Sequence, residues 1–138
     1  MAEDFRGREK REFLRYSYKK PLKYNIINVL KNKHFSPEFI GAISRNLSAS
    51  GIFFVTDVEE VPNISSLLVM DLDYQTANIC KEVEERALIL NNKLIGRVVR
   101  IEDNEDGTYG IGVAFITRSN PLSKELQTNI ESLINSRR

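Results

Sequence analysis

The chain has 138 residues, enough for one domain that buries roughly two-thirds of its unfolded surface. Its 41% hydrophobic and 28% charged content is that of a soluble globular protein, and the absence of a run of 18 apolar residues argues against a transmembrane helix. The net charge of +1 conceals an asymmetry: residues 1–24 carry eight Lys/Arg against four Asp/Glu, whereas the other 114 residues carry twelve against fifteen. A positive field at one end is expected to attract a small polyanion.

The residue inventory argues against several chemistries. Cys80 and His34 are each the single residue of their type, so we expect no internal disulfide and no zinc site. The sequence has no glycine-rich phosphate loop and no G-x-S-x-G motif, so we expect neither an enzyme nor a cofactor. The acidic start lacks an apolar segment typical of a secretory signal. We therefore expect a cytoplasmic protein without membrane insertion.

The sequence of the first third of the chain predicts an N-terminal arm followed by a strand. Residues 1–9 are polar and charged and are expected to form a flexible N-terminal arm. Pro21 interrupts any earlier helix, and residues 22–30 have the β-rich, alternating character of a first strand. Residues 31–38 predict a turn, in which His34 is expected to be exposed.

The middle of the chain predicts several short strands. Residues 39–56 read as two strands joined at "NLSASG", where Gly51 suits a positive φ. Residues 74–92 predict a short helix or loop insertion followed by extended chain. Further strands are predicted over residues 64–73, 93–102 and 108–116. The last of these strands places small residues on one face, and this pattern predicts close approach of another element there.

The end of the chain changes to helical periodicity. Asn120 followed by Pro121 predicts a helix start, with the proline in the first helical position. One apolar stripe follows, which we expect to pack on the core; it is made of Leu122, Leu126, Ile130 and Leu133. Short antiparallel strands followed by one helix predict a mainly β fold, a small barrel with a C-terminal α-helix packed on it.

Two polar motifs offer nucleotide-binding chemistry. Arg11 and Arg15 are four residues apart, and each guanidinium has a planar fork that fits a phosphate or the O6/N7 edge of guanine. Asn46, Ser48 and Gly51 lie in the turn between two predicted strands and offer an amide, a hydroxyl and a flexible backbone. Each motif alone is common, whereas the two in this order are far more specific.

Arg11-x-x-x-Arg15 followed by Asn46-x-Ser48-x-x-Gly51 resembles the paired motifs of the PilZ domain family, bacterial receptors of cyclic di-GMP. The segment "GRVVRIEDNEDGTYGIGVAF" is similar to the late strands of that family. The resemblance implies a six-stranded antiparallel β-barrel over residues 10–118, with a C-terminal helix over 119–138.

The resemblance also implies roles for individual residues. Arg11 and Arg15 would contact guanine edges and phosphates of cyclic di-GMP, Asn46 and Ser48 would hydrogen-bond the ligand, and Gly51 would keep the shape of the turn. The family often has a further arginine where this chain has Lys10, which keeps the charge but loses the fork. That difference leaves open whether one ligand binds or an intercalated dimer.

We expect a receptor that acts on an effector protein in trans, with motility, exopolysaccharide, development or virulence as the output. A nucleotide-independent PilZ-type adaptor is the main alternative, although such family members usually lack the arginine pair. A general nucleic-acid binder would be far more basic than pI 7.8, so we expect no DNA partner. On the plainer interpretation, the arginines belong to a solvated arm and the turn residues serve only the backbone.

Overall fold

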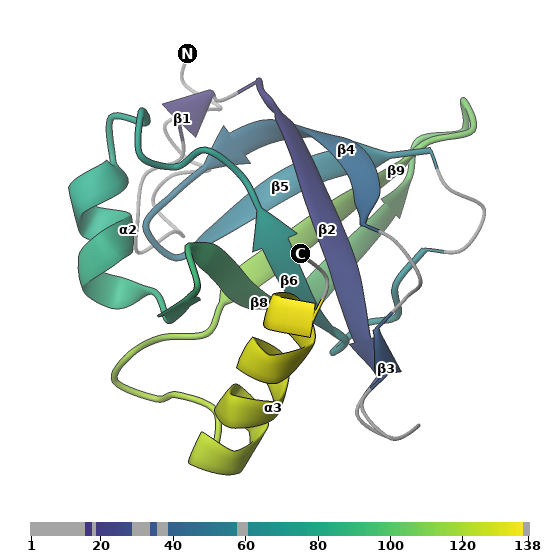
Figure 1. The fold of residues 1–138 in the computed structure, drawn as a ribbon. Helices are drawn as coiled ribbons and strands as arrows, with labels where there is room; N and C mark the ends of the chain where they lie inside the picture. The colour runs from purple at the N-terminus through teal and green to yellow at the C-terminus, as the bar shows by residue number, and fades with distance from the viewer. Residues whose placement is uncertain (1–15, 18, 29–33, 36–38, 58–60, 137–138) are drawn as a thin grey trace.

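Six antiparallel strands form a closed barrel (Figure 1). The computed structural model describes residues 16–17, 19–28, 34–35, 39–57 and 61–136. In order around the barrel, the strands are β2 (Pro21–Asn28), β4 (Ile40–Leu47), β5 (Gly51–Thr56), β9 (Tyr109–Phe115), β8 (Lys93–Asp103) and β6 (Leu67–Asp71). β2 pairs with both β4 and β6, and this double pairing closes the sheet. The predicted mainly β fold, a six-stranded barrel with a C-terminal helix, is confirmed.

Three two-residue strands extend the sheet: β1 (Tyr16–Ser17) pairs with β4, β3 (His34–Phe35) with β2, and β7 (Ile89–Leu90) with β8. The prediction that His34 belongs to a turn was wrong, because it pairs with Asn28 at the end of β2. The flexible arm predicted over residues 1–9 lies outside the described residues.

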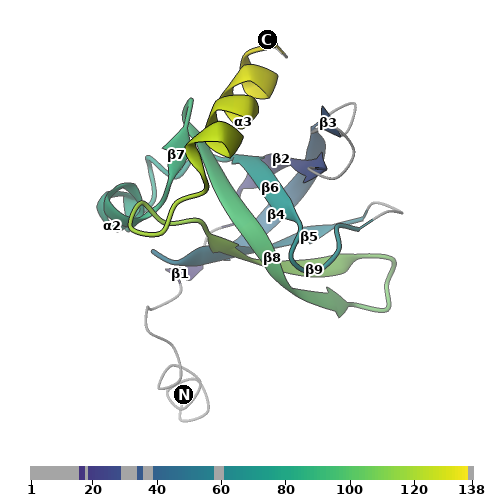
Figure 2. The same cartoon turned by 90° about the horizontal axis from the view of Figure 1, so that it is seen from below.

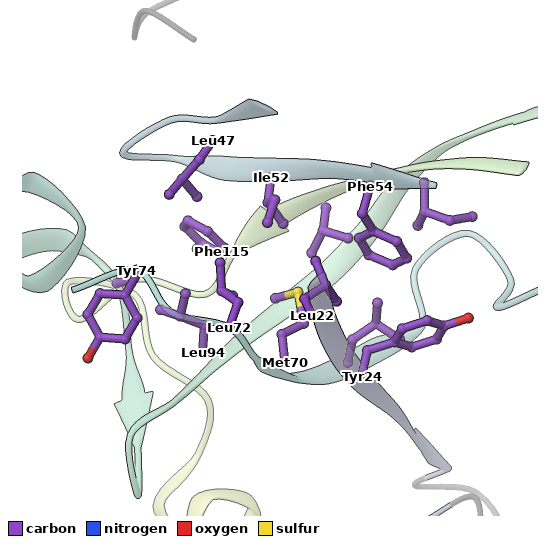
Figure 3. Packing of buried hydrophobic residues seen from close by; sticks show 14 of the residues in the cluster. Leu22, Tyr24, Leu47, Ile52, Phe54, Met70, Leu72, Tyr74, Leu94 and Phe115 are labelled. Carbon is purple, nitrogen blue, oxygen red and sulfur yellow. The ribbon is translucent and has the colours of Figure 1, made fainter. Parts of the chain in front are cut away.

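The core fills the barrel because alternate strand residues point inward. Tyr24 and Phe54 are fully buried with ring centroids 5.0 Å apart, toward one end of the packed cluster in Figure 3. The hydroxyl of Tyr24 lies 3.3 Å from Thr56 Oγ1, so its polar end has a partner. Burial raises the pKa of Tyr24 and keeps the phenol neutral. This tyrosine therefore serves sheet packing.

The insertion predicted at residues 74–92 covers the other end of the barrel. It contains the helix α2 (Cys80–Arg86) and then β7, as expected from its sequence. Tyr74, Ile79 and Val83 are buried against the barrel cluster (Figure 3 shows Tyr74 beside Leu94). Its extended part is held by the Leu88 N–H, which donates to Ile116 O at 2.7 Å. The insertion thus closes the core at this end.

The helix α3 (Lys124–Ser136) covers an outer face of the barrel (Figure 2). Ile130 and Ile134 are buried, and Leu122, Leu126 and Leu133 pack beside them. Their partners on the strands are Ile27, Leu67, Val69, Leu90 and Ile95. Because β6 is covered on both faces here, its residues Leu67–Met70 are all buried. The predicted apolar stripe is therefore core.

The start of α3 differs from the prediction. Pro121 precedes the helix, which begins at Lys124. Ser123 is the cap: its Oγ accepts the Leu126 N–H at 3.2 Å, and its carbonyl accepts the Gln127 N–H at 2.9 Å. A serine side chain that satisfies an N–H of the first turn outweighs the proline signal. In the described part of the chain, neither helix has the length and apolarity to cross a membrane.

Ile130→Ala is expected to lower the free energy of unfolding by about 2–5 kcal/mol, because it leaves a cavity between α3 and the barrel. Thr128→Ala on the exposed side of the same helix should change it by less than about 0.5 kcal/mol. Urea denaturation of both variants is the measurement. Equal stability of the two would contradict the packing of α3 on the barrel.

Candidate functional site

The turn between β4 and β5 is organised by Ser48. Its side chain is buried, and its Oγ accepts the N–H groups of Ser50 and Gly51 at 3.3 and 3.2 Å. The Ser48 N–H donates to Gly51 O at 2.9 Å, which closes the hairpin. Ser48 therefore shapes the turn, as the plainer interpretation expects, and its hydroxyl also lies 3.2 Å from Ser50 Oγ.

Gly51 is required by the approach of β9, and the prediction of a positive φ was wrong. Among the described glycines, Gly107 is the one with a left-handed φ. A Cβ on Gly51 would lie 2.2 Å from the backbone oxygen of Val113, so β5 and β9 come too close for any side chain. The Phe115 N–H also donates to Ser50 O at 2.9 Å. The turn is thus fixed onto β9.

Asn46 is half-buried near the end of β4, just after an irregularity in the pairing. The register between β4 and β5 shifts between Ser44 and Asn46, which indicates a β-bulge at Arg45. Ser44 and Leu47 are buried on the core side, whereas Arg45 is exposed. The amide of Asn46 is therefore placed on the outer side of the barrel, opposite Phe53 on β5.

An outward row continues from Asn46 across three further strands. Phe53 pairs with Gly112, and Gly112 pairs with Arg100. The guanidinium of Arg100 lies 5.0 Å from the centroid of the Phe53 ring, and its Nε lies 3.0 Å from Glu102. This contact is a cation–π pair on the barrel surface.

The glycines of β9 make room for this row. A Cβ on Gly110 would lie 2.4 Å from the Phe53 ring, and one on Gly112 would lie 3.2 Å from the Cβ of Arg100. The small residues predicted to permit close approach are thus covered by two side chains. The aromatic member, Phe53, was missed by sequence reasoning. The pattern that could have revealed it is an aromatic residue at an outward position of one strand, opposite the glycines of "YGIGVAF" in the next.

A second arginine lies beside the turn. Gly51 pairs with Ala114 on β9, and Ala114 pairs with Arg97 on β8. The exposed Arg97 therefore lies two strands away from the turn, in the same row of the sheet. Its guanidinium donates to Ser65 O at 3.0 Å. Together with Arg45 and Arg100, Arg97 places three guanidinium groups on the outer face, of which that of Arg100 is paired with Glu102.

The pairing of β1 places the two residues that follow the arginine motif beside the end of β4, just before the turn. Tyr16 pairs with Leu47 and Ser17 pairs with Asn46, so the chain that follows the arginine motif runs antiparallel to the turn motif. Farther along, the Ser44 N–H donates to Lys20 O at 2.9 Å, and the Ser44 hydroxyl contacts the same backbone. Arg11, Arg15 and the tentative Lys10 lie outside the described residues, and Arg15 directly precedes Tyr16 in the sequence.

The described residues hold no cluster of three or more His, Cys, Asp or Glu that would bind a metal ion. Cys80 is half-buried at the start of α2, and burial raises the pKa of its thiol. Around the turn, the described residues offer an amide, a hydroxyl, guanidinium groups and an aromatic face.

The sequence also matches a known protein family. The sequence profile of the PilZ domain matches residues 9–132. The chain belongs to the PilZ domain family. A comparison with curated protein sequences gives no match.

Solved structures with the same fold have low sequence identity. The Bacillus subtilis inhibitor of motility MotI/DgrA is 17% identical with a TM-score of 0.50, and the match covers 94% of this chain and 54% of that one. The PilZ domain of Escherichia coli YcgR with c-di-GMP is 12% identical (TM-score 0.46, 94% and 95% covered). The K. pneumonia MrkH–c-di-GMP complex is 14% identical (0.41, 92% and 51%). This chain therefore spans about half the length of MotI/DgrA and of MrkH.

Gly51→Ala is expected to lower the free energy of unfolding by about 1–3 kcal/mol, because its methyl group would overlap the Val113 carbonyl. Gly41→Ala is the matched control, since a Cβ there meets nothing within 4 Å. Thermal denaturation compares the two variants. A Gly51→Ala protein as stable as Gly41→Ala would contradict the steric role of Gly51.

Proposed function

We propose that this chain is a cytoplasmic receptor of cyclic di-GMP that relays the second-messenger signal to an effector protein in trans. The observation that carries the proposal is the pairing of β1 with β4, because it sets the chain next to the arginine motif against Asn46 and the Ser48–Gly51 turn. Membership of the PilZ domain family supports it. PilZ domains are binding and adaptor modules, so the function is recognition and no catalysis is proposed.

The ligand's chemistry fits the residues around the turn. Cyclic di-GMP presents two phosphates and two guanine edges, and arginine forks pair with both kinds of group. Arg11 and Arg15 supply these forks, and the outward amide of Asn46 supplies a donor and an acceptor for a guanine edge. Ser48 and Gly51 would fix the backbone of the turn beside the bound ligand.

The Phe53–Arg100 pair is proposed as a platform beside the turn. A guanidinium stacked on a ring presents its outer flat face to solvent, and nucleobases stack on such faces. Asn46 is the next outward residue of the same row. A guanine held by the Asn46 amide would therefore reach this platform.

Electrostatics favour the same ligand. Residues 1–24 are strongly basic, and the outward arginines of β4 and β8 add to that field. A doubly charged ligand is attracted to it, and because these contacts lie at the surface the affinity is expected to fall as salt rises. Lys10 bears on whether one ligand binds or an intercalated dimer, since a lysine attracts a phosphate but lacks the planar pairing of an arginine.

Arg11→Ala and Arg15→Ala are each expected to weaken cyclic di-GMP binding about thirtyfold or more, because loss of a charge-assisted fork costs about 2–3 kcal/mol. Isothermal titration calorimetry measures this, with GTP and GMP as competing nucleotides and Lys81→Ala on α2 as the control variant. The wild-type stoichiometry separates one ligand from an intercalated dimer. Unchanged affinity in either variant would contradict the role of that arginine.

Arg100→Ala is expected to reduce affinity by about fivefold, since a stacking or cation–π contact at an exposed site is worth about 1 kcal/mol. The same calorimetric titration gives the value. Lys124→Ala, at the start of α3, removes a cation elsewhere on the surface and should leave affinity unchanged. Equal affinity of the Arg100→Ala and Lys124→Ala proteins would remove the platform from the site.

A further inference from the structure

A hollow of about 690 Å³ lies next to the outward row that begins at Asn46, at the end of β5 opposite the Ser48–Gly51 turn. Its floor is apolar: Ile43 of β4 lies between Pro21 of β2 and Val55 of β5 in the register of the sheet. Half of the Ile43 surface is exposed. Gly41 leaves the centre open, because a Cβ there would meet no atom within 4 Å. An aliphatic or aromatic side chain from outside fits this space.

The rim of the hollow is acidic. Asp57, Asp71 and Asp73 line it, with Lys23 as the lining residue of opposite sign. Asp71 and Asp73 each have one lysine at 3.6 Å, and both side chains remain about half exposed. Carboxylates therefore outnumber Lys23 in the lining itself. Lys20 and Lys93, just outside it, pair with two of them, and Asp57 is the carboxylate of the rim without such a pair among the described residues.

The Asp73 side of the rim is held in place. The Thr76 hydroxyl donates to Asp73 Oδ2 at 2.9 Å, and Lys20 Nζ donates to Thr76 Oγ1 at 2.7 Å. The hydrogen bond from Thr76 lowers the pKa of Asp73, so this carboxylate stays ionised at neutral pH. Lys20 also belongs to the segment between β1 and β2, whose backbone Ser44 binds. The rim is thus tied to the chain that follows the arginine motif.

We infer that this hollow is the docking surface for the effector, and that the docked segment is a basic protein segment with one large apolar anchor. The anchor fills the space over Gly41, and flanking Lys or Arg side chains meet Asp57, Asp71 and Asp73. Phosphate-bearing partners are disfavoured, because the rim repels them. The closed sheet offers no free barrel edge here, so recognition is by side chains.

The position of the surface suits a signal relay. Val55 and Phe53 are two residues apart on β5, a spacing of about 7 Å. A segment in the hollow would therefore lie next to the outward row that begins at Asn46. This inference rests on the proposed function, because the docked protein is the effector of the cyclic di-GMP receptor. It adds the kind of protein segment that the receptor would bind.

The test selects binders from a display library of random 12-residue peptides on the folded full chain, without nucleotide. Selected peptides are expected to be net basic with an aliphatic or aromatic residue. Their affinity should fall about tenfold or more for Ile43→Asp and for Asp57→Lys. Ile64→Asp is the matched control, because Ile64 is 53% exposed against 50% for Ile43; Glu125→Lys on α3 controls for the charge reversal.

Three outcomes would overturn the inference: no enriched peptides, acidic peptides, or binding that Ile43→Asp leaves intact. Self-association that Ile43→Asp abolishes, measured by light scattering, would instead assign the hollow to a second copy. RNA or anionic vesicles competing with the peptides at the hollow would also contradict a basic protein partner. Binding of cyclic di-GMP by the Ile43→Asp variant with wild-type affinity would show that the nucleotide site of the variant is folded. Failure of wild-type nucleotide binding would contradict the proposed function and leave the peptide result standing.

Discussion

The contact between β5 and β9 at Gly51 is the constraint on which the site depends. The backbone of β9 approaches so closely that Gly51 has no room for a Cβ, and Ser50 accepts the Phe115 N–H at the same point. The buried hydroxyl of Ser48 then accepts the N–H groups of Ser50 and Gly51. This close approach thus fixes both the pairing of β5 with β9 and the position of the polar turn.

The same strands divide the outer face into two surfaces of opposite character. The glycines of β9 admit Phe53 and Arg100, which continue the row that begins at Asn46. Ile43 of β4 and Val55 of β5, which pair with each other beyond the bulge at Arg45, form the apolar floor of the hollow. Ligand recognition and partner docking are therefore proposed on adjacent rows of the same sheet.

Much of the fold follows from local patterns, whereas the details of the site depend on distant strands. The alternation in β4 and β9 and the stripe of α3 reflect the burial of one face, so sequence periodicity predicts them. The reason for Gly51 was not predictable, because it lies in the backbone of Val113, sixty-two residues away. Phe53, Gly112 and Arg100 likewise meet only through sheet register. Pro121 misled the prediction of the helix start because Ser123 caps the helix by a local hydrogen bond.

Chemical-shift mapping of cyclic di-GMP on the ¹⁵N-labelled full chain tests whether the nucleotide binds at the turn and the outward row. The backbone amides expected to shift on saturation are those of the arginine motif, Asn46, the Ser48–Gly51 turn, Phe53 and Arg100. The amides of Gly41, Ile43 and Val55 should move little. Shifts centred on the acidic hollow, or an unchanged spectrum at saturating nucleotide, would contradict binding at the turn and the outward row.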